Sequence, residues 1–397
     1  MNLSSKIDSI LENEKFNNLV EFAQYIGNNS FSEDLTKKLL GRFFELKARE
    51  RAIPLRVTFE LTPFCNLNCK MCYVHLSNNE YDNRSLLPLD IWKSIASQAY
   101  KLGMRIVTLT GGECLTYPRF DDLYLYLFHM GIDIIVLSNG VLMDSKRIDF
   151  FRKFPPKCIQ VSLYGSNENA YEKVTGKRQF SRIYHNLNCL RDAGLHIQIA
   201  ITPNRFMIDD IEQLIKLVHS LQIPYEINCR LIKPRTNTGR SIEDMTLEQY
   251  IKIYRIRSAL YNKYPVPVDP TELPMENQTG QSREGLLCGA GRSSCSINYE
   301  GNMMPCVSLY NYTASVTELG FCKAWERIHE YAIHYPLPIE CNGCIYAPIC
   351  IHCQAQHQCA PLGHCDRQIC ERTKKLAETG FYHYIGNASK RIKQIDE

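Results

Sequence analysis

The sequence lacks the segments that carry a protein across or into a membrane. Its first twenty residues contain no basic start followed by an apolar core, so we find no secretory signal. No apolar run approaches the roughly 20 residues that span a bilayer. We therefore expect a cytoplasmic protein without membrane association.

An excess of charge of one sign is also missing. The 46 Lys and Arg nearly balance 42 Asp and Glu, for a net charge of +4, and no long basic run is present. The most basic stretch, residues 37–56, has acidic residues interspersed and is typical of a solvated helix face. Nucleic acid is therefore not an expected partner. The 45% hydrophobic and 22% charged residues indicate a globular protein with a sizeable core.

Cysteine, in contrast, is abundant, with 18 in 397 residues. Cytoplasmic thiols stay reduced, so we expect metal ligands rather than disulfides. Eleven of the cysteines fall into the spaced groups described below. Four others are expected to be buried as small apolar residues: Cys158, Cys189, Cys229 and Cys322.

Hydrophobic periodicity predicts an α/β fold. Residues 1–50 have helical spacing, interrupted at residues 27–30. Thereafter short apolar runs alternate with amphipathic stretches, which is typical of a parallel sheet with crossover helices. The expected strands are 56–62, 105–110, 134–138, 158–164, 196–202 and 225–232. The expected helices are 89–102, 119–130, 144–153, 180–193 and 207–221. Six such units predict a partial (β/α)6 TIM-like barrel, with a doubly wound open sheet as the alternative.

The same patterns divide the chain into five segments. The expected segments are a helical N-terminal segment (1–50), the partial barrel (52–240), a bridging helix and loop (241–285), a small cysteine-rich C-terminal domain (286–375) and a helical tail (376–397). The cysteine-rich domain has few long regular elements and little apolar sequence. We therefore expect bound metal to stabilise it.

The first cysteine group is a C-x3-C-x2-C triplet, Cys65, Cys69 and Cys72, directly after the first expected strand. Three thiolates can hold three irons of a cubane cluster and leave the fourth iron open, whereas clusters that only carry electrons normally have four protein ligands. A structural zinc site is the alternative, but it needs a fourth ligand, for which His75 is the nearby candidate.

Polar motifs follow the next three expected strands. They are Thr110-Gly111-Gly112-Glu113, Ser138-Asn139-Gly140 and Ser162-Leu163-Tyr164-Gly165. Active sites of β/α barrels are built at the carboxyl ends of the strands, so these motifs are expected to meet the cysteine triplet. Glycine lets a backbone approach a ligand closely, and a carboxylate suits a cation.

Together, these motifs resemble the signature of the radical S-adenosylmethionine (radical SAM) superfamily over residues 52–235. The resemblance implies a [4Fe–4S] cluster on the triplet, whose open iron binds S-adenosylmethionine beside the aromatic Tyr73. It implies that Gly111, Gly112 and Glu113 meet the methionine amino group. It further implies nucleoside contacts from Ser138 and Asn139 and a ribose contact from Ser162.

Two positions depart from the family pattern. Cys114 stands where a proline is usual, and we expect it to be a small apolar filler. The helix after the fourth strand usually carries an Arg-Gly pair whose arginine holds the methionine carboxylate. The matching stretch here runs from Val174 to Arg178, and Arg178 or Lys177 is the candidate substitute.

The C-terminal cysteines resemble the SPASM (twitch-type) extension of radical SAM proteins, which carries two auxiliary [4Fe–4S] clusters. The resemblance implies that one cluster is held by Cys288, Cys295, Cys306 and Cys353, and the other by Cys341, Cys344, Cys350 and Cys370. Two residues, rather than the usual three, separate Cys350 from Cys353, so Cys359 or Cys365 could replace Cys353 or Cys370. A zinc ribbon formed by Cys341, Cys344, Cys350 and Cys353 is the alternative.

The resemblance implies an oxidoreductase. A 5′-deoxyadenosyl radical would abstract hydrogen from a substrate, which would then lose an electron to an auxiliary cluster. In SPASM proteins this chemistry often makes a thioether or carbon–carbon crosslink in a ribosomally made peptide, so a peptide maturase is expected. Val307 stands where sulfatase-maturing relatives have a catalytic aspartate, which disfavours that activity, and no other base is assigned.

The expected partners follow from the same resemblance. A flavodoxin- or ferredoxin-type protein would donate electrons. Fifty helical residues are too few for the leader-binding domain of many peptide-modifying relatives, so a separate leader-binding protein, a leaderless peptide or a small molecule remains open. The alternatives are a radical SAM dehydrogenase of a small molecule and a non-catalytic multi-cluster electron-transfer protein.

Overall fold

The computed structural model describes most of the chain. It describes residues 11, 16, 18–29, 31–74, 86–228, 231, 235, 245–260, 285–286, 288–342, 344, 346, 350, 353–357 and 360–379. The expectations for His75, Cys229, Cys359, residues 1–10 and the tail beyond residue 379 lie outside these residues. None of the helices in the described part is long and apolar enough to cross a membrane.

The described strands form one sheet in the order β6-β5-β4-β3-β2-β1-β7-β8-β9. The first six strands are β1 (Arg56–Glu60), β2 (Ile106–Thr110), β3 (Asp133–Ser138), β4 (Cys158–Ser162), β5 (Ile197–Ile201) and β6 (Tyr225–Ile227). Each pairs in parallel with the next along the chain. This sequential order confirms the predicted (β/α)6 arrangement and excludes the doubly wound sheet, in which the strand order would reverse.

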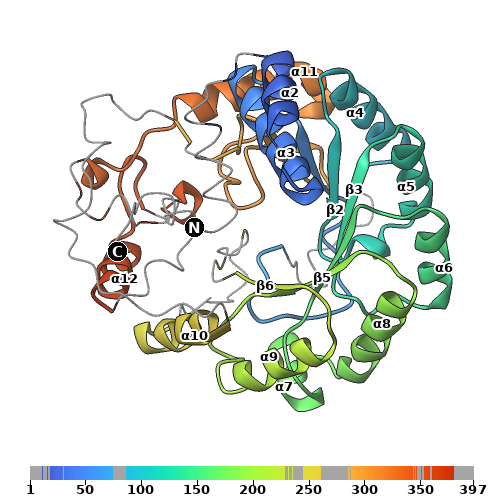
Figure 1. Cartoon of the computed structure of the whole chain (residues 1–397), viewed down its shortest axis with the longest axis vertical. Coiled ribbons are helices and arrows are strands. Elements are labelled where there is room, and N and C mark those ends of the chain that lie inside the picture. Colours follow the sequence, from blue (N-terminus) through green and yellow to red (C-terminus); the bar gives the residue numbers. More distant parts are fainter. Residues whose placement is uncertain are drawn as a thin grey trace.

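Helices cover the outer side of the curved sheet (Figure 1). Between the barrel strands lie α4 (Leu89–Lys101), η2 (Cys114–Thr116), α5 (Phe120–His129), α6 (Ser145–Lys153), α7 (Glu168–Thr175), α8 (Phe180–Asp192) and α9 (Ile211–Ser220). Five match predicted helices, but α7 was not predicted. Its signals are local: the side chain of Asn167 caps its first turn, and Gly176 ends it in a left-handed conformation with φ 68°.

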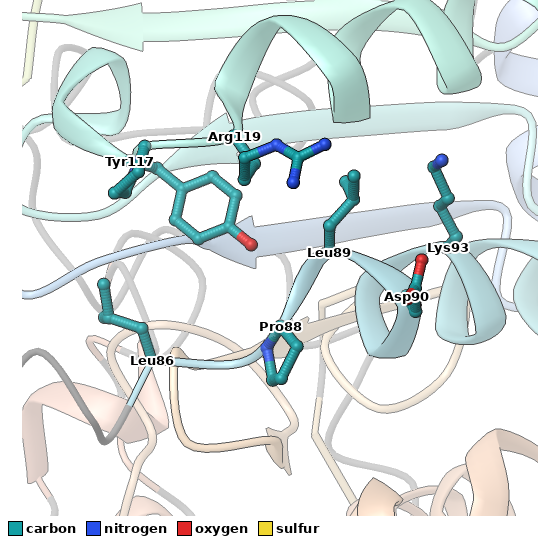
Figure 2. Close-up of a pocket in the computed structure, with 8 residues that line it drawn as sticks. Leu86, Pro88, Leu89, Asp90, Lys93, Tyr117 and Arg119 are labelled. Atoms are coloured by element: carbon teal, nitrogen blue, oxygen red, sulfur yellow. The ribbon is translucent and has the colours of Figure 1, made fainter.

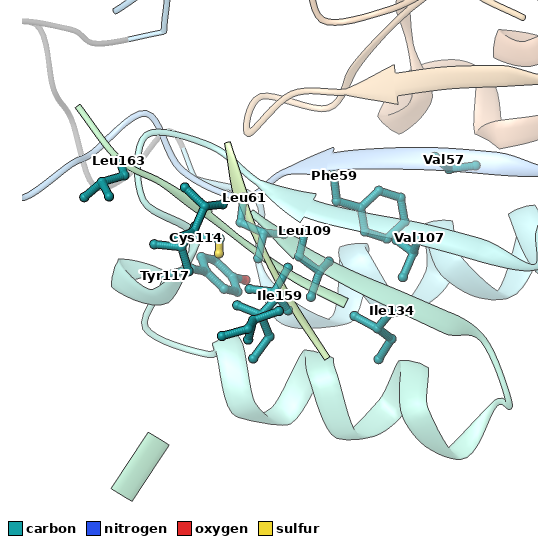
Figure 3. Close-up of a cluster of buried hydrophobic side chains, with 14 of the residues drawn as sticks. Val57, Phe59, Leu61, Val107, Leu109, Cys114, Tyr117, Ile134, Ile159 and Leu163 are labelled. Carbon is teal, nitrogen blue, oxygen red and sulfur yellow. The ribbon is translucent and has the colours of Figure 1, made fainter. Parts of the chain in front are cut away.

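Successive side chains of β1 point to opposite faces of the sheet, and one of these faces packs into the main hydrophobic core. Val57 and Phe59 of β1 are buried in the main hydrophobic core, and the Phe59 ring lies 4.7 Å from Trp92 of α4. Glu60, on the other side of β1, is also fully buried. Cys114 belongs to the main core (Figure 3), as expected for an apolar filler.

The N-terminal and bridging segments are helical where they are described. The two N-terminal helices α2 (Leu19–Asn28) and α3 (Glu33–Glu50) have a small core of their own, with the rings of Phe22 and Phe43 stacked at 4.4 Å. The bridging helix is α10 (Leu247–Leu260).

The C-terminal segment contains more regular structure than its sequence suggested. It contributes β7 (Ser294–Ile297), β8 (Asn302–Met304), β9 (Ala314–Ser315), α11 (Val316–Ile333), η4 (Ile339–Cys341), η5 (Gln354–His357) and α12 (Arg367–Glu378). β7 pairs in parallel with β1, so this segment extends the barrel sheet. The non-helical conformation of Gly320 inside α11 explains why its periodicity was missed.

Candidate functional site

The cysteine loop, residues 65–72, follows β1 and is fixed by backbone hydrogen bonds. The amides of Asn68 and Lys70, one on each side of Cys69, donate to the last two carbonyls of α7, Thr175 at 2.9 Å and Val174 at 3.0 Å. The loop is therefore held against the C-terminal end of the helix that follows β4.

The thiols of the loop interact electrostatically with one tyrosine. Burial raises the pKa of the Tyr164 hydroxyl, and the charges of Cys69, Cys72 and Cys65 add to the rise. Burial also raises the pKa of Cys65 to about 12. A metal that binds such thiols must displace their protons.

Gly111 and Gly112 are required by close backbone packing. A Cβ at Gly111 would lie 2.4 Å from the carbonyl oxygen of Thr62, and one at Gly112 would lie 2.3 Å from that of Phe64. The Gly112 amide donates to the Thr62 carbonyl at 2.7 Å. The glycine pair thus brings the end of β2 against the segment that leads into the cysteine loop.

Glu113 joins two of the predicted motifs. Its carboxylate is buried and accepts hydrogen bonds from the Ser138 hydroxyl at 3.0 Å and the Asn139 amide at 2.7 Å. The Leu115 amide donates to it at 3.2 Å. Burial raises the pKa of Glu113. All of these described donors are neutral, so the carboxylate is suited to a cationic ligand.

Asn139 completes the connection to the cysteine loop. Its side-chain nitrogen donates to Asn66 Oδ1 at 2.7 Å and lies 3.6 Å from Cys65 Sγ. Gly-Gly-Glu, Ser-Asn-Gly and the cysteine triplet are therefore parts of one hydrogen-bonded network. Ser162 hydrogen-bonds the side chain of Tyr164, which lowers the pKa of that hydroxyl.

A buried ion pair that the motifs did not indicate lies beside Tyr73. Arg235 donates to both carboxylate oxygens of Glu60, at 2.6 and 2.9 Å, and to the carbonyl of Val307 at 2.7 Å. Its guanidinium lies 5.2 Å from the Tyr73 ring centre. Arg235 thus links β1, the residue after the cysteine loop and the C-terminal segment. The sequence signal for this ion pair is Glu60, a charged residue inside the first expected strand.

The structure does not bring Arg178 to this network. Its guanidinium donates to Glu172 at 2.7 Å and to Asn169 at 3.1 Å, and both charged side chains are exposed. Lys177 is exposed as well. In this conformation neither residue reaches the position predicted for binding the methionine carboxylate.

The C-terminal cysteines separate into two groups. Burial raises the pKa of Cys306 to about 12, with further contributions from Cys288 and Cys353; these three are the first C-terminal group. Burial also raises the pKa of Cys341 to about 12, and Cys350, Cys365 and Cys344 add to it. Cys370 Sγ lies 3.1 Å from Cys365 Sγ. The second C-terminal group therefore comprises Cys341, Cys344, Cys350, Cys365 and Cys370.

This grouping differs from the predicted ligand sets at two positions. Cys295 lies in the main hydrophobic core beside Val57, and burial alone raises its pKa. Cys365, which was predicted as a replacement for Cys353 or Cys370, lies within the second group. Among the described residues, no three Cys, His, Asp or Glu side chains are arranged to hold a single metal ion. In a cubane each iron takes only one thiolate, so cluster ligands need not converge on one point.

The cysteines that were expected to be buried as small apolar residues are not all buried. Cys158 and Cys189 are half-buried, but Cys322 is exposed, with its sulfur 3.6 Å from Glu326 of α11. The expected burial of Cys322 is therefore wrong. Its helix was not predicted, so its outward face could not be assigned.

A pocket of about 510 Å³ lies between the start of α4 and the turn after η2. Figure 2 shows Tyr117 and Arg119 facing Leu89 and Lys93 across it. Arg119 pairs with Asp122 at 2.6 Å. No cysteine lines this pocket, which is separate from the network described above.

Comparison with known proteins identifies a family and several relatives. Residues 59–244 match the Radical SAM superfamily. The antilisterial bacteriocin subtilosin biosynthesis protein AlbA of Bacillus subtilis is 25% identical over 268 residues, which cover 65% of this chain and 56% of AlbA. An AdoMet-dependent heme synthase of Methanosarcina barkeri is 23% identical over 327 residues, covering 76% of this chain and 92% of the synthase.

Among solved structures, Streptococcus suis SuiB bound to precursor peptide SuiA has a TM-score of 0.63 at 15% identity. The match covers 91% of this chain and 88% of SuiB. At that identity, the comparison establishes a shared fold.

Proposed function

Because the chain carries a radical SAM domain, we propose that it is a radical SAM oxidoreductase that modifies a ribosomally made peptide. Proteins of this superfamily bind S-adenosylmethionine and a [4Fe–4S] cluster. The observation that carries the proposal is the hydrogen-bonded network joining the cysteine loop, Glu113 and Asn139. The similarity to AlbA supports a peptide as the substrate.

The residues of the network fit the two cofactors. Three thiols on one anchored loop are the donor set for a cluster with one open iron: Cys65, Cys69 and Cys72. When bound, the cluster and S-adenosylmethionine together supply the 5′-deoxyadenosyl radical. The Glu113 carboxylate, buried among neutral donors, would accept a hydrogen bond from the methionine ammonium.

The protein's own contribution is to position these groups and exclude water. Gly111 and Gly112 let the end of β2 approach the cysteine loop, and Asn139 orients Asn66 next to Cys65. Ser138, Asn139, Ser162 and Tyr73 remain proposed cofactor contacts. The exposed pair of Arg178 with Glu172 gives no support to a role in holding the carboxylate.

The two C-terminal groups are proposed to hold two auxiliary [4Fe–4S] clusters, one of which accepts the electron that the substrate loses. The first cluster would use Cys288, Cys306 and Cys353, and the second would use four of the five thiols in its group. A flavodoxin- or ferredoxin-type protein would donate the electrons, and a separate leader-binding protein would present the peptide.

The test uses anaerobically reconstituted protein, dithionite, S-adenosylmethionine and synthetic peptides that match any short open reading frames beside the gene. We expect one peptide to lose two hydrogen atoms, as measured by mass spectrometry, when a thioether or carbon–carbon crosslink forms. The Cys72→Ala variant is the control and should leave the peptide unchanged. Formation of 5′-deoxyadenosine without any change in the peptides would contradict the peptide substrate.

A small-molecule substrate is the second candidate. The heme synthase is matched over 92% of its length, whereas AlbA is matched over 56%. Iron-coproporphyrin and other tetrapyrroles should therefore be assayed in parallel. Consumption of a tetrapyrrole, with the peptides unchanged, would favour this candidate.

A further inference from the structure

Arg235 contacts the first strand of the barrel, although it follows the last one in the chain. In the sheet order β6-β5-β4-β3-β2-β1, all the other barrel strands lie between β6 and β1. Arg235 nevertheless donates to the Glu60 carboxylate of β1, and its amide donates to the carbonyl of Tyr73 at 3.1 Å. A residue after β6 therefore contacts both β1 and the residue that follows the cysteine loop.

Two backbone contacts of Arg235 lie next to proposed cluster ligands. Its amide donates to the carbonyl of Tyr73, which follows Cys72 of the cysteine loop. Its guanidinium donates to the carbonyl of Val307 at 2.7 Å, and Val307 follows Cys306 of the first C-terminal group. Because each contact is one residue from a cysteine, a shift of either segment would break a hydrogen bond to Arg235.

Arg235 also completes the anchoring of the cysteine loop. Asn139 contacts the Cys65 end of the loop, and the end of α7 holds the backbone on both sides of Cys69. Arg235 holds the residue after Cys72. Each cysteine of the loop therefore lies next to a different anchor, and one of the three anchors also contacts the C-terminal segment.

The ion pair with Glu60 fixes the direction of the guanidinium. The Glu60 side chain is fully buried, and its two oxygens accept from separate nitrogens of Arg235 at 2.6 and 2.9 Å. Such a two-point contact specifies geometry, whereas the loss of hydration offsets much of the stability that a buried ion pair provides. The rings of Tyr73 and Tyr310 lie 5.2 and 5.6 Å from the guanidinium. The pair therefore orients Arg235 between the two segments.

We propose that Arg235 is a positioning residue that fixes the cysteine loop relative to the first C-terminal group, and so couples the two halves of the proposed reaction. This inference rests on the proposed function. In that reaction, one hydrogen atom of the peptide goes to 5′-deoxyadenosine. A second leaves as a proton, to solvent, and as an electron, to an auxiliary cluster. Misplacement of reacting groups by about 1 Å can slow a reaction about 100-fold.

The test removes the ion pair without leaving either partner buried alone. A double variant, Glu60→Met with Arg235→Met, replaces both charges with apolar side chains, which is often neutral for stability. The matched control is Asp121→Met with Arg147→Met. Arg147 is 18% exposed, against 14% for Arg235, and it too contacts a carboxylate and aromatic rings. Its partners belong to α5 and α6, so it contacts neither cysteine segment.

The first measurement is amide hydrogen exchange in the metal-free protein. The amides of Cys72 and Leu309 close the turns at the two segments, with donor–acceptor distances of 3.2 and 3.1 Å. In the double variant that lacks Arg235, both should exchange about tenfold faster, the effect of one lost hydrogen bond to a charged group. The amides of β3 and the whole control variant should keep wild-type rates. An unchanged rate at either turn, or an equal rise in β3, would overturn the inference.

The second measurement uses the reconstituted enzyme with the peptide that the wild type modifies. The ratio of 5′-deoxyadenosine to modified peptide should rise about tenfold in the double variant that lacks Arg235 and stay unchanged in the control. A loss of stability alone would lower both products in proportion, so an unchanged ratio would overturn the coupling. A wild-type protein that forms no 5′-deoxyadenosine would instead overturn the proposed function, and the exchange rates would still test the placement of the two segments.

Discussion

The cysteine loop and the C-terminal cysteine groups differ in what holds their thiols together. The loop is anchored by backbone hydrogen bonds to α7 and by the side chain of Asn139, and it lies against the main core. Of the C-terminal thiols, Cys306 and Cys353 pack against a separate small core of six buried residues. One site is formed by the barrel itself, whereas the other depends more on what its thiols bind.

The largest expected effect separates the catalytic role of the loop from that of the C-terminal groups. Cys72→Ala should abolish cleavage of S-adenosylmethionine because the remaining two thiols cannot retain the cluster. Cys306→Ala should still cleave S-adenosylmethionine but fail to oxidise the substrate. Chromatography of 5′-deoxyadenosine and mass spectrometry of the peptide measure the two activities. Equal loss of cleavage in both variants would remove the distinction between the regions.

The next effect concerns the contact between the regions. Glu60→Gln should lower the free energy of unfolding by about 3–5 kcal/mol, because it leaves the guanidinium of Arg235 buried beside Val307 without its carboxylate. Denaturant unfolding measures the loss. The control is Glu172→Gln, which breaks an exposed pair and should cost no more than about 1 kcal/mol. Similar costs for both variants would mean that the buried pair does not fasten the C-terminal segment to the barrel.

A matched pair of cysteine variants sharpens the account of the C-terminal region. Cys306→Ala should lose about four irons from a total of about twelve, as expected for one of three cubane clusters. Cys295→Ala should keep its iron and lose only about 1 kcal/mol of stability to the small cavity in the core. Iron and sulfide analysis of the two purified variants shows which of the two cysteines is a cluster ligand. Loss of iron in Cys295→Ala would restore the predicted ligand set.

The smallest expected effect is that of Arg178→Ala. Both charged side chains of its pair with Glu172 are exposed, so stability should change by no more than about 1 kcal/mol. The affinity for S-adenosylmethionine, measured by equilibrium dialysis, should stay within about twofold of the wild type. A tenfold weaker affinity would show that Arg178 moves to hold the methionine carboxylate after all.

The barrel was predictable because its signals are periodic. The six strands were found to within a few residues, since buried parallel strands are continuous apolar runs. Their carboxyl ends carry Glu113, Asn139 and Cys65, so the convergence of these residues follows from the topology of a barrel. The motif did not indicate that Gly111 and Gly112 also serve the close contact with Thr62 and Phe64. Their contact with the methionine amino group stays a prediction.

The remaining features depend on tertiary contacts that no short pattern carries. Cysteine spacing cannot distinguish a ligand from a core residue, and only the pairing of β7 with β1 places Cys295 in the core. The partner of Glu60 lies 175 residues away at Arg235. Helix α7 was not predicted, although its last residues lie in the stretch that was compared with the family's Arg-Gly pair.

The central claim is that the cysteine loop and the two strand-end motifs joined to it form one site for a cluster and S-adenosylmethionine. Its most direct test is the yield of 5′-deoxyadenosine from anaerobically reconstituted wild-type protein after reduction with dithionite in the presence of S-adenosylmethionine. The account predicts 5′-deoxyadenosine and methionine in equal amounts. A protein that holds its full complement of iron and forms no 5′-deoxyadenosine would contradict it.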